Sequence, residues 1–514
     1  MVVFRRWFLV LLCVGLVVAV AAGAALLAWP SVGVAASESG LAGISLPGFS
    51  GHVESVSVTG KRGRPVPIVL RGGTVWPRVR LAPGERVTVH VEISRPGWIG
   101  WLVGRHEERT MTVVTPAAHI RSALLSPRRG TAVSVSFDEP VSRVAIGGGK
   151  LRRLATGRNV VPLGVRAAGA ATTGTTTVAA AVRPWETLPQ PTLVSWFVPG
   201  ARREVVAQPA TGSRISPSTV LTLTFAKPVN AVLGSRLPRL EPAMPGHWTQ
   251  IDPHRLSFRP AGLGFGLGAV VHVQLPGETL AWRVGSGSIL RLQELLARLG
   301  YLPVSWNGAA ATTPAAEVAA AVSPPRGTFS WRYPGTPASL QRLWKPGAWN
   351  VVTEGAVMRF ENVHGMGTDG VAGPQVWRAL MHDDLANRRS SAGYSYVFVH
   401  ETVPQSLSLW HDGRVILTSP GNTGIASAPT AQGTWPVFEH ISVGTMSGTN
   451  PDGSHYNDPG IRWISYFHGG DALHEFPRAS FGTPQSLGCV ELPEAAAAKV
   501  WPYTPIGTLV TIES

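Results

Sequence analysis

The stretch Gln405-Ser-Leu-Ser-Leu-Trp410, followed by His411-Asp412-Gly413 and then Val415-Ile-Leu417, predicts two strands joined by a tight turn. Apolar and polar side chains alternate in the first segment, which places the apolar ones on one face of a strand. Asp-Gly between two such segments is typical of a hairpin turn. We therefore expect an antiparallel hairpin here, within a mainly-β region.

Alternating segments broken by Gly and Pro also fill residues 43–282. Part of this pattern repeats, because Leu125-Ser-Pro127 with Val133–Phe137 has a counterpart in Ile215-Ser-Pro217 with Leu221–Phe225. With 58 Gly and 43 Pro in 514 residues, long helical bundles are disfavoured. The pattern predicts tandem β-sandwich modules, and the second copy resembles the bacterial immunoglobulin-like domains of surface proteins.

The periodicity becomes helical after Ser288. Apolar residues then recur every three or four positions from Ile289 to Leu299, and Gly300 ends the helix. Together with a later helical stretch, this region resembles the three-helix peptidoglycan-binding domain, on these residues: Leu292-Gln293, Leu296, Leu299-Gly300-Tyr301, Phe360, Asp369-Gly370, Gly373-Pro374 and Trp377. A Pro/Gly/Trp-rich insertion, Pro303 to Asn350, departs from that family and leaves glycan binding an open question.

The N-terminal apolar run, Trp7 to Trp29, follows Arg5 and Arg6. At about 1.5 Å per residue it covers the hydrocarbon of a bilayer, and the preceding charges put the N-terminus in the cytoplasm. We expect a single-pass anchor in the cell membrane, with the following domains in the cell wall. Cleavage after Ala36 is the alternative and would give a secreted chain.

The net charge of +15 comes from a charged fraction of only 15%. Such a basic balance favours a polyanionic neighbour. No nucleic-acid reading motif appears and the charges are scattered, so we expect no nucleic-acid partner. For an exported chain, the expected polyanion is the cell envelope.

The chain has two cysteines, and Cys13 lies inside the apolar run. Cys489 is then a lone exported thiol that cannot form an internal disulfide, so it is either a buried apolar side chain or a nucleophile. A catalytic thiol needs an imidazole to take its proton, and His474 lies fifteen residues upstream. Backbone N–H groups of Gly488 and Cys489 could hold an oxyanion.

The C-terminal motifs occur in a characteristic order: Ser419-Pro-Gly-Asn-Thr-Gly424, Pro429-Thr430, Gly433-Thr-Trp435-Pro-Val437, His468-Gly469-Gly470, Ala472-Leu473-His474 and Ser486-Leu-Gly-Cys489-Val490. With the preceding hairpin, they resemble the L,D-transpeptidase (YkuD-type) catalytic domain over about Tyr396 to Glu513. The resemblance implies acyl transfer on peptidoglycan stem tetrapeptides, giving 3→3 cross-links, with carbapenem β-lactams as inhibitors. It implies no cofactor, and no HxH or CxxC spacing predicts a metal site.

The same resemblance implies roles for single residues. Cys489 would be the nucleophile and His474 the general base, with His468 as the alternative base or a substrate-side residue. Ser486 would support the site rather than attack, because no nucleophile elbow surrounds it. His440 and His455 have no comparable context, and we expect them to be solvated.

Two positions depart from the family pattern. Leu487 stands where the family most often has His, and Glu491 stands where Arg or Asn is common. If position 491 meets a substrate carboxylate, Glu491 would repel it unless Arg478 compensates. Donor specificity is therefore less defined by the sequence than the reaction type.

The expected organisation is a multidomain, mainly-β chain in the following order: 1–36 anchor or signal, 43–119 β-sandwich module, 120–190 β module with an Ala/Thr/Gly-rich linker (167–181), 195–284 Ig-like module, 285–385 peptidoglycan-binding-like helical domain and 394–514 catalytic domain.

Two other functions fit the same residues. With water as the acyl acceptor, the site would make an L,D-carboxypeptidase. With an inert Cys489, the chain would be a non-catalytic scaffold attached to the wall. A depressed thiol pKa would favour catalysis, and an inert buried thiol would favour the scaffold.

Overall fold

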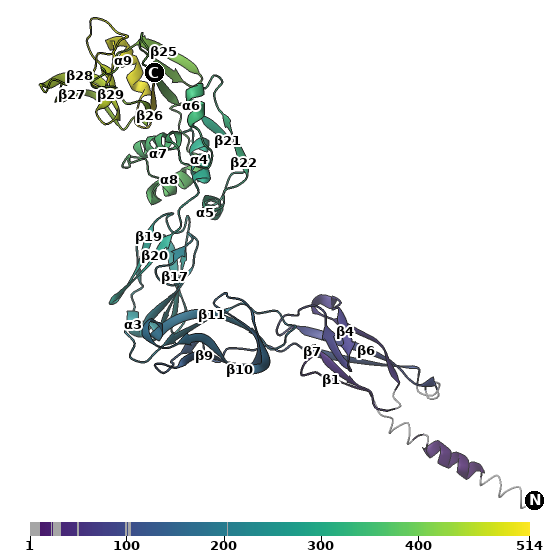
Figure 1. Cartoon of the computed structure of the whole chain (residues 1–514). Helices are drawn as coiled ribbons and strands as arrows, with labels where there is room; N and C mark the ends of the chain where they lie inside the picture. Colours follow the sequence, from purple (N-terminus) through teal and green to yellow (C-terminus); the bar gives the residue numbers. More distant parts are fainter. Residues whose placement is uncertain are drawn as a thin grey trace, which may run out of the picture. The chain divides into compact units, whose positions relative to one another are not determined.

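The computed structural model describes residues 11–21, 23, 32–48, 51–97, 100, 104–202 and 204–514. The chain divides into two compact units, residues 1–206 and 207–514. Strands dominate the elements of both units (Figure 1). The expected multidomain, mainly-β class is confirmed.

The predicted anchor lies only partly within the described residues. Residues 11–21 are helical, and both ends of the apolar run lie outside the description. Among the residues that are described, no helix has both the length and the apolar character needed to cross a membrane. Strand β1 (Gly33–Ala36) pairs antiparallel with β2 (Ala42–Ser45), although its residues were assigned to the anchor or signal segment. Cleavage after Ala36 would therefore remove an edge strand from the first sheet.

The first part of unit 1 contains two small sheets, in the orders β1-β2-β5-β4 and β3-β6-β7. Alternate residues of β6 are buried, as its alternating sequence requires. The inward side chains form one apolar cluster that Trp185 joins from later in the chain. The remaining elements here are β3 (His52–Thr59), η1 (Lys61–Gly63), β4 (Ile68–Arg71), β5 (Thr74–Pro77), β6 (Arg86–Ser94) and β7 (His106–Val114).

A five-stranded sheet in the order β10-β9-β11-β12-β8 completes unit 1. Its elements are β8 (Leu124–Leu125), β9 (Ala132–Ile146), β10 (Arg152–Arg166), η2 (Gly169–Thr172), β11 (Thr173–Ala181) and β12 (Thr192–Phe197). The prediction of a linker over residues 167–181 was wrong, because most of this segment forms the central strand β11. Thr173–Val178 pair with β12, Val178–Ala181 pair with β9, and Val178 and Ala180 are buried in the core.

Residues 205–284, nearly all of them in unit 2, form two four-stranded sheets, in the orders β13-β15-β18-β17 and β14-β20-β19-β16. Phe225, Phe258 and Trp282 are among the buried side chains of this region. The elements are β13 (Val205–Gln208), β14 (Arg214–Ile215), β15 (Leu221–Phe225), α3 (Val229–Leu233), β16 (Arg239–Glu241), β17 (Gly246–Asp252), β18 (Arg255–Pro260), β19 (Val270–Leu275) and β20 (Glu278–Val284).

The predicted helical region follows, and α4, α7 and α8 pack together in it (Figure 1). Helix α4 ends at Arg298, just before Gly300, whose φ of 87° suits glycine. The insertion is structured and adds a hairpin and two helices. The elements are α4 (Ile289–Arg298), β21 (Val304–Gly308), α5 (Pro314–Val322), β22 (Gly327–Trp331), α6 (Ala338–Leu343), α7 (Val351–Val363) and α8 (Pro374–Leu385).

The C-terminal region holds two sheets, β25-β24-β23-β31-β26 and β27-β28-β29-β30. The predicted hairpin is β24 and β25, with Ser406 opposite Pro420 and the turn at Asp412 and Gly413. The elements are β23 (Ser395–His400), β24 (Ser406–His411), β25 (Arg414–Pro420), β26 (Gly433–Pro436), β27 (Glu439–Thr449), β28 (His455–His468), β29 (Asp471–Glu475), β30 (Val490–Leu492), α9 (Glu494–Val500), η3 (Trp501–Tyr503) and β31 (Leu509–Glu513).

The helical region and the C-terminal sheets share a core. Tyr396, Trp410 and Leu509 from the sheets belong to the same buried cluster as residues of α4, α7 and α8. A second cluster fills the space between the two C-terminal sheets and α9. The helices are therefore packed against the sheets and are not simply tethered to them.

Candidate active site

Cys489 and His474 lie on one face of the sheet that contains β29 and β30. These strands are parallel neighbours, with His474 opposite Glu491. Side chains two positions apart on a strand share a face, so Cys489, which precedes β30, projects to the side of Glu491 and His474. The packing supports this placement. Cys489 contacts the apolar cluster that includes Ala472, and Ala472 lies two residues before His474, on the same face of β29.

The His474 ring is buried and held in one tautomer. Its side chain is 3% exposed, and Nδ1 donates a hydrogen bond to the Glu475 carbonyl oxygen at 2.7 Å. Nε2 is therefore left without a hydrogen in the neutral ring. Burial lowers the pKa of His474, and the Glu475 carbonyl and the Glu491 carboxylate oppose that shift. The net result is a neutral imidazole with a free lone pair on Nε2.

The Cys489 thiol is half-buried, and its Sγ lies 3.6 Å from the Gly470 carbonyl oxygen. Burial raises the pKa of this thiol to about 12, the Ala472 N–H opposes the rise, and the carboxylates of Asp471 and Glu491 add to it. The direction is opposite to the depressed pKa expected of a catalytic thiolate. The resting thiol is protonated because two carboxylates and an apolar cluster surround it.

Ser486 closes the turn that carries the cysteine. Its hydroxyl is buried, donates to the Cys489 carbonyl oxygen at 2.5 Å and accepts from the Gly488 N–H at 3.3 Å. Residue 486 is also bridged to Gly424, within the Thr-Gly segment. Ser486 thus shapes the backbone around Cys489, and its hydrogen bond to the Gly488 N–H competes with any oxyanion for that donor.

Gly488 is required by its surroundings. Its φ is 116°, and a Cβ at this position would lie 2.3 Å from Asp471 Oδ1. Asp471 is held in turn by the Ala431 N–H, which donates to Oδ2 at 3.1 Å. Sequence reasoning did not single out Asp471, and its place beside the nucleophile depends on the pairing of β28 with β29.

His468 faces Asp471 and Trp435. Its Nδ1 lies 3.6 Å from Asp471 Oδ2, and its ring centroid lies 4.3 Å from that of Trp435. The ring is 44% exposed, unlike the buried His474. His468 therefore meets the site through Asp471 from an exposed position, whereas His474 is buried on the face that carries the thiol.

Arg478 and Glu491 form a bidentate ion pair. Nε donates to Oε2 at 2.8 Å and Nη2 to Oε1 at 2.6 Å. Arg478 also donates to the Gln485 carbonyl and lies over the Phe476 ring. The charge of Glu491 is therefore neutralised by a residue of the loop before the cysteine.

Several other side chains surround the thiol or differ from expectation. Burial and the nearby Cys489 raise the pKa of both Tyr456 and Tyr466 on β28. No local pattern around these tyrosines could have placed them there. His440, which was expected to be solvated, instead stacks on Trp501, with 4.2 Å between the two ring centroids. His455 is exposed.

Residues 395–512 match the family model of the YkuD L,D-transpeptidase catalytic domain. This part of the chain is an L,D-transpeptidase catalytic domain. It contains both C-terminal sheets and all the candidate site residues described above. None of the curated proteins matches the sequence significantly.

Solved structures with some likeness to the chain are also L,D-transpeptidases. One from Mycobacterium smegmatis is 13% identical over 60% of this chain and 99% of its own, with a TM-score of 0.22. L,D-transpeptidase 3 from Mycobacterium tuberculosis, with a faropenem-derived adduct, is 12% identical over 60% of this chain and 97% of its own, with a TM-score of 0.21. The E. faecium catalytic domain acylated by ertapenem is 23% identical over 24% of this chain and 98% of its own, with a TM-score of 0.22. At these scores the likeness adds nothing to the family match.

Proposed function

We propose that the chain forms 3→3 peptidoglycan cross-links by a cysteine acyl-enzyme mechanism on stem tetrapeptides. The observation that carries the proposal is the placement of Cys489 and His474 on one face of neighbouring parallel strands, with His474 Nδ1 committed to the Glu475 carbonyl. That commitment leaves Nε2 as the proton acceptor for the thiol.

In the first half-reaction, His474 acts as a general base on a neutral thiol. Nε2 takes the Sγ proton while sulfur attacks the carbonyl carbon between the third, diamino-acid residue and the terminal D-Ala. The tetrahedral intermediate then breaks its C–N bond, and His474 returns the proton to the leaving D-Ala amine. A resting thiolate is not needed, which agrees with the raised pKa of Cys489.

In the second half-reaction, the side-chain amine of a neighbouring stem attacks the thioester. His474 accepts the amine proton, the C–S bond breaks, and the thiol is restored with that proton. With water as the acceptor, the same steps would give a trimmed stem, which is the carboxypeptidase alternative.

The oxyanion of each tetrahedral intermediate needs donors near Cys489. We assign the Cys489 backbone N–H as the main donor, because the Gly488 N–H already donates to Ser486 Oγ. Gly488 contributes by bringing the backbone close to the substrate carbonyl. Ser486 holds this turn in place through its bond to the Cys489 carbonyl.

Substrate recognition would rest on Arg478, Glu491 and His468. Because Arg478 neutralises Glu491, this pair presents no net negative charge to the carboxylate of a stem peptide. His468 is partly exposed at the edge of the site and can contact the donor or acceptor strand. Carbapenems would acylate Cys489 as stem analogues, in line with the acylated L,D-transpeptidase described above.

We also propose that the N-terminal run anchors the chain in the cell membrane, with all later domains on the outer side. The arginines before the run support that orientation. The helical region would then meet peptidoglycan glycan, and the net charge of +15 would favour the anionic envelope.

Product analysis tests the reaction type. The purified full chain should convert disaccharide-tetrapeptides into dimers joined between two third residues, with release of D-Ala, as measured by mass spectrometry. Trimmed tripeptide monomers without dimers would establish the carboxypeptidase instead. The Cys489→Ala variant is the control and should give neither product.

The scaffold alternative has one observation in its favour, which is the raised pKa of the thiol. It predicts no product and no covalent adduct for the wild-type chain. The ordered His474 tautomer favours catalysis, because an inert thiol has no use for a free imidazole lone pair on its own face of the sheet.

A further inference from the structure

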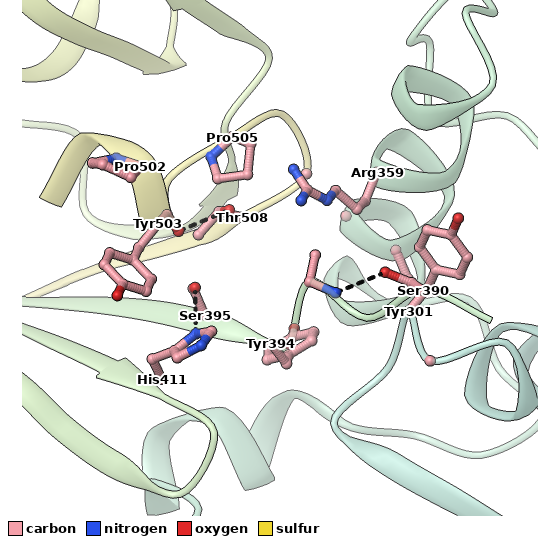
Figure 2. A pocket seen from close by; sticks show the side chains of 16 residues that line it. Tyr301, Arg359, Ser390, Tyr394, Ser395, His411, Pro502, Tyr503, Pro505 and Thr508 are labelled. Atoms are coloured by element: carbon pink, nitrogen blue, oxygen red, sulfur yellow. Dashed lines mark hydrogen bonds between the residues drawn. The ribbon is translucent and has the colours of Figure 1, made fainter.

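A cavity separate from the cysteine site lies between α7, the loop that leads into β23, the end of β24 and the turn between η3 and β31. It encloses about 160 Å³ and is lined by sixteen residues, none of which is Asp or Glu (Figure 2). This volume is close to the roughly 150 Å³ of a protein cavity that binds one benzene molecule. A small molecule or ion fits, and a peptide does not.

Arg359 on α7 points its guanidinium into this cavity (Figure 2). Within the described part of unit 2, no hydrogen bond or ion pair involves the Arg359 side chain. Burial lowers the pKa of Arg359, so its charge is partly desolvated. The Tyr301 phenol opposes this shift but carries no charge as a neutral group, so burial of the cation costs free energy that an anion in the cavity would recover.

The opposite wall of the cavity supplies hydroxyl groups. Ser395 Oγ lies 3.1 Å from His411 Nδ1, so the Ser395 hydroxyl can donate to a ligand when Nδ1 carries the hydrogen (Figure 2). Ser390 also lines the cavity, and its Oγ accepts only a long bond of 3.4 Å from the Ala392 N–H. A guanidinium fork with nearby hydroxyls is typical of sites for phosphate and carboxylate groups.

The two walls are held at a fixed spacing by a glycine contact. A Cβ on Gly355 of α7 would lie 2.5 Å from the Gly507 carbonyl oxygen, and Gly507 has a φ of 87°. The backbones of α7 and the turn before β31 therefore touch directly. This close contact fixes one edge of the cavity, so the cavity is not a gap between loosely packed elements.

We propose that this cavity binds a small oxyanion, a phosphate or carboxylate group, on Arg359, and that the anion links α7 to the catalytic domain. The site does not depend on the proposed transpeptidation, because no residue of the cysteine site lines it. Removing the anion should loosen the packing of α7 without changing the residues around Cys489.

The test is equilibrium binding of inorganic phosphate and, separately, acetate to the full chain, in chloride at constant ionic strength. The wild-type chain should show saturable one-site binding of at least one of them. Arg359→Gln should weaken that binding at least tenfold, whereas the exposed Arg414→Gln, which removes the same charge from β25, should leave it unchanged. Preference for phosphate over acetate would identify the ligand as a phosphate.

Two results would overturn the proposal: no saturable binding of either anion to the wild-type chain, or equal binding by Arg359→Gln. Thermal unfolding in chloride checks folding, and Arg359→Gln should be no less stable than wild type because the uncompensated charge is gone. If that variant does not fold, Arg359→Lys, which keeps the charge but loses the fork, should bind several-fold more weakly. Unchanged affinity in Arg359→Lys would then contradict the proposal.

Discussion

Burial holds both His474 and Cys489 in their uncharged forms, since it lowers the pKa of the imidazole and raises that of the thiol. The sequence motif identified both residues as candidates. It could not indicate their protonation states, because these depend on burial and on the carboxylates of Asp471 and Glu491, which the sheet brings near the two side chains. The Arg478–Glu491 pair was anticipated only as a possibility, and its geometry follows from the loop between β29 and β30.

The two histidines make a matched pair for mutation. His474→Gln should lower kcat/KM by about 10²- to 10⁴-fold, the range typical of a lost general base. His468→Gln should lower it by less than about tenfold, because that ring faces Asp471 and Trp435. Steady-state kinetics with a tetrapeptide donor would measure both, and the reverse ranking would make His468 the base.

The pH dependence of kcat/KM tests whether His474 and Cys489 are both uncharged in the free protein. The pKa of His474 is lowered from 6.5, so kcat/KM should decline only below about pH 6.5, as the ring becomes protonated. Since the pKa of Cys489 is about 12, thiolate absorbance should not appear in the free protein below about pH 10. A thiolate present at pH 7 would show that the pair rests as an ion pair.

Gly488→Ala tests the backbone at the nucleophile. The new Cβ would collide with Asp471 Oδ1 and would sit at a φ of 116°, a conformation that costs a non-glycine residue on the order of 1 to 3 kcal/mol. We expect loss of most activity and a lower Tm, measured by kinetics and calorimetry. Wild-type activity in this variant would mean that the turn is not held as described.

At the element scale, α4 shows where local pattern fails. Its apolar stripe predicted the helix, but Arg291 and Glu294, on what should be the solvent face, are fully buried. The insertion helix α5 covers them with Glu317, which accepts from Arg291 at 2.6 Å. The periodicity of a helix cannot predict which of its polar residues a later segment of the chain will bury.

This buried cluster predicts a pH-dependent stability. Burial raises the pKa of Glu294 and Glu317 to about 7 each. A carboxyl group whose folded pKa exceeds its unfolded value stabilises the fold below the unfolded pKa, and this contribution disappears as pH rises through the folded pKa. Urea unfolding of the helical region should therefore show falling stability between about pH 4.5 and 7.

Glu317→Gln should reduce that slope, since one of the titrating groups is gone. Glu354→Gln on α7 is the control and should leave the slope unchanged, because this side chain is outside the cluster. Glu294 and Glu361, whose pKa values burial also raises to about 7, account for the residual slope in the variant. Stability that rises with pH over this range would contradict the assignment.

At the scale of the whole molecule, the mainly-β class and the catalytic region followed from alternation and motif order. The motifs also suggest a catalytic region that folds independently of the helices, and the structure does not have this arrangement. Tyr396, Trp410 and Leu509 belong to the core built by α4, α7 and α8. Sequence patterns show which side chains are apolar but not which module buries them. The linker predicted over 167–181 failed for a related reason, since pairing on both sides makes its Thr and Ala residues a strand.

Truncation tests this shared core. A fragment of residues 394–514 should unfold at a Tm several degrees below the catalytic transition of a 285–514 fragment, because three large apolar side chains lose their cover. Calorimetry of the two fragments gives the comparison. Equal transition temperatures would show that the helices add no stability to the catalytic domain.

The proposed mechanism depends on an acyl-enzyme that Cys489 forms with help from His474. Intact-mass spectrometry of the full chain after incubation with a carbapenem detects such an adduct. We expect a mass increase of one carbapenem in the wild-type chain, a much slower increase in His474→Gln, and none in Cys489→Ala. An adduct that persists in Cys489→Ala, or no adduct on the folded wild-type chain, would contradict the proposed mechanism.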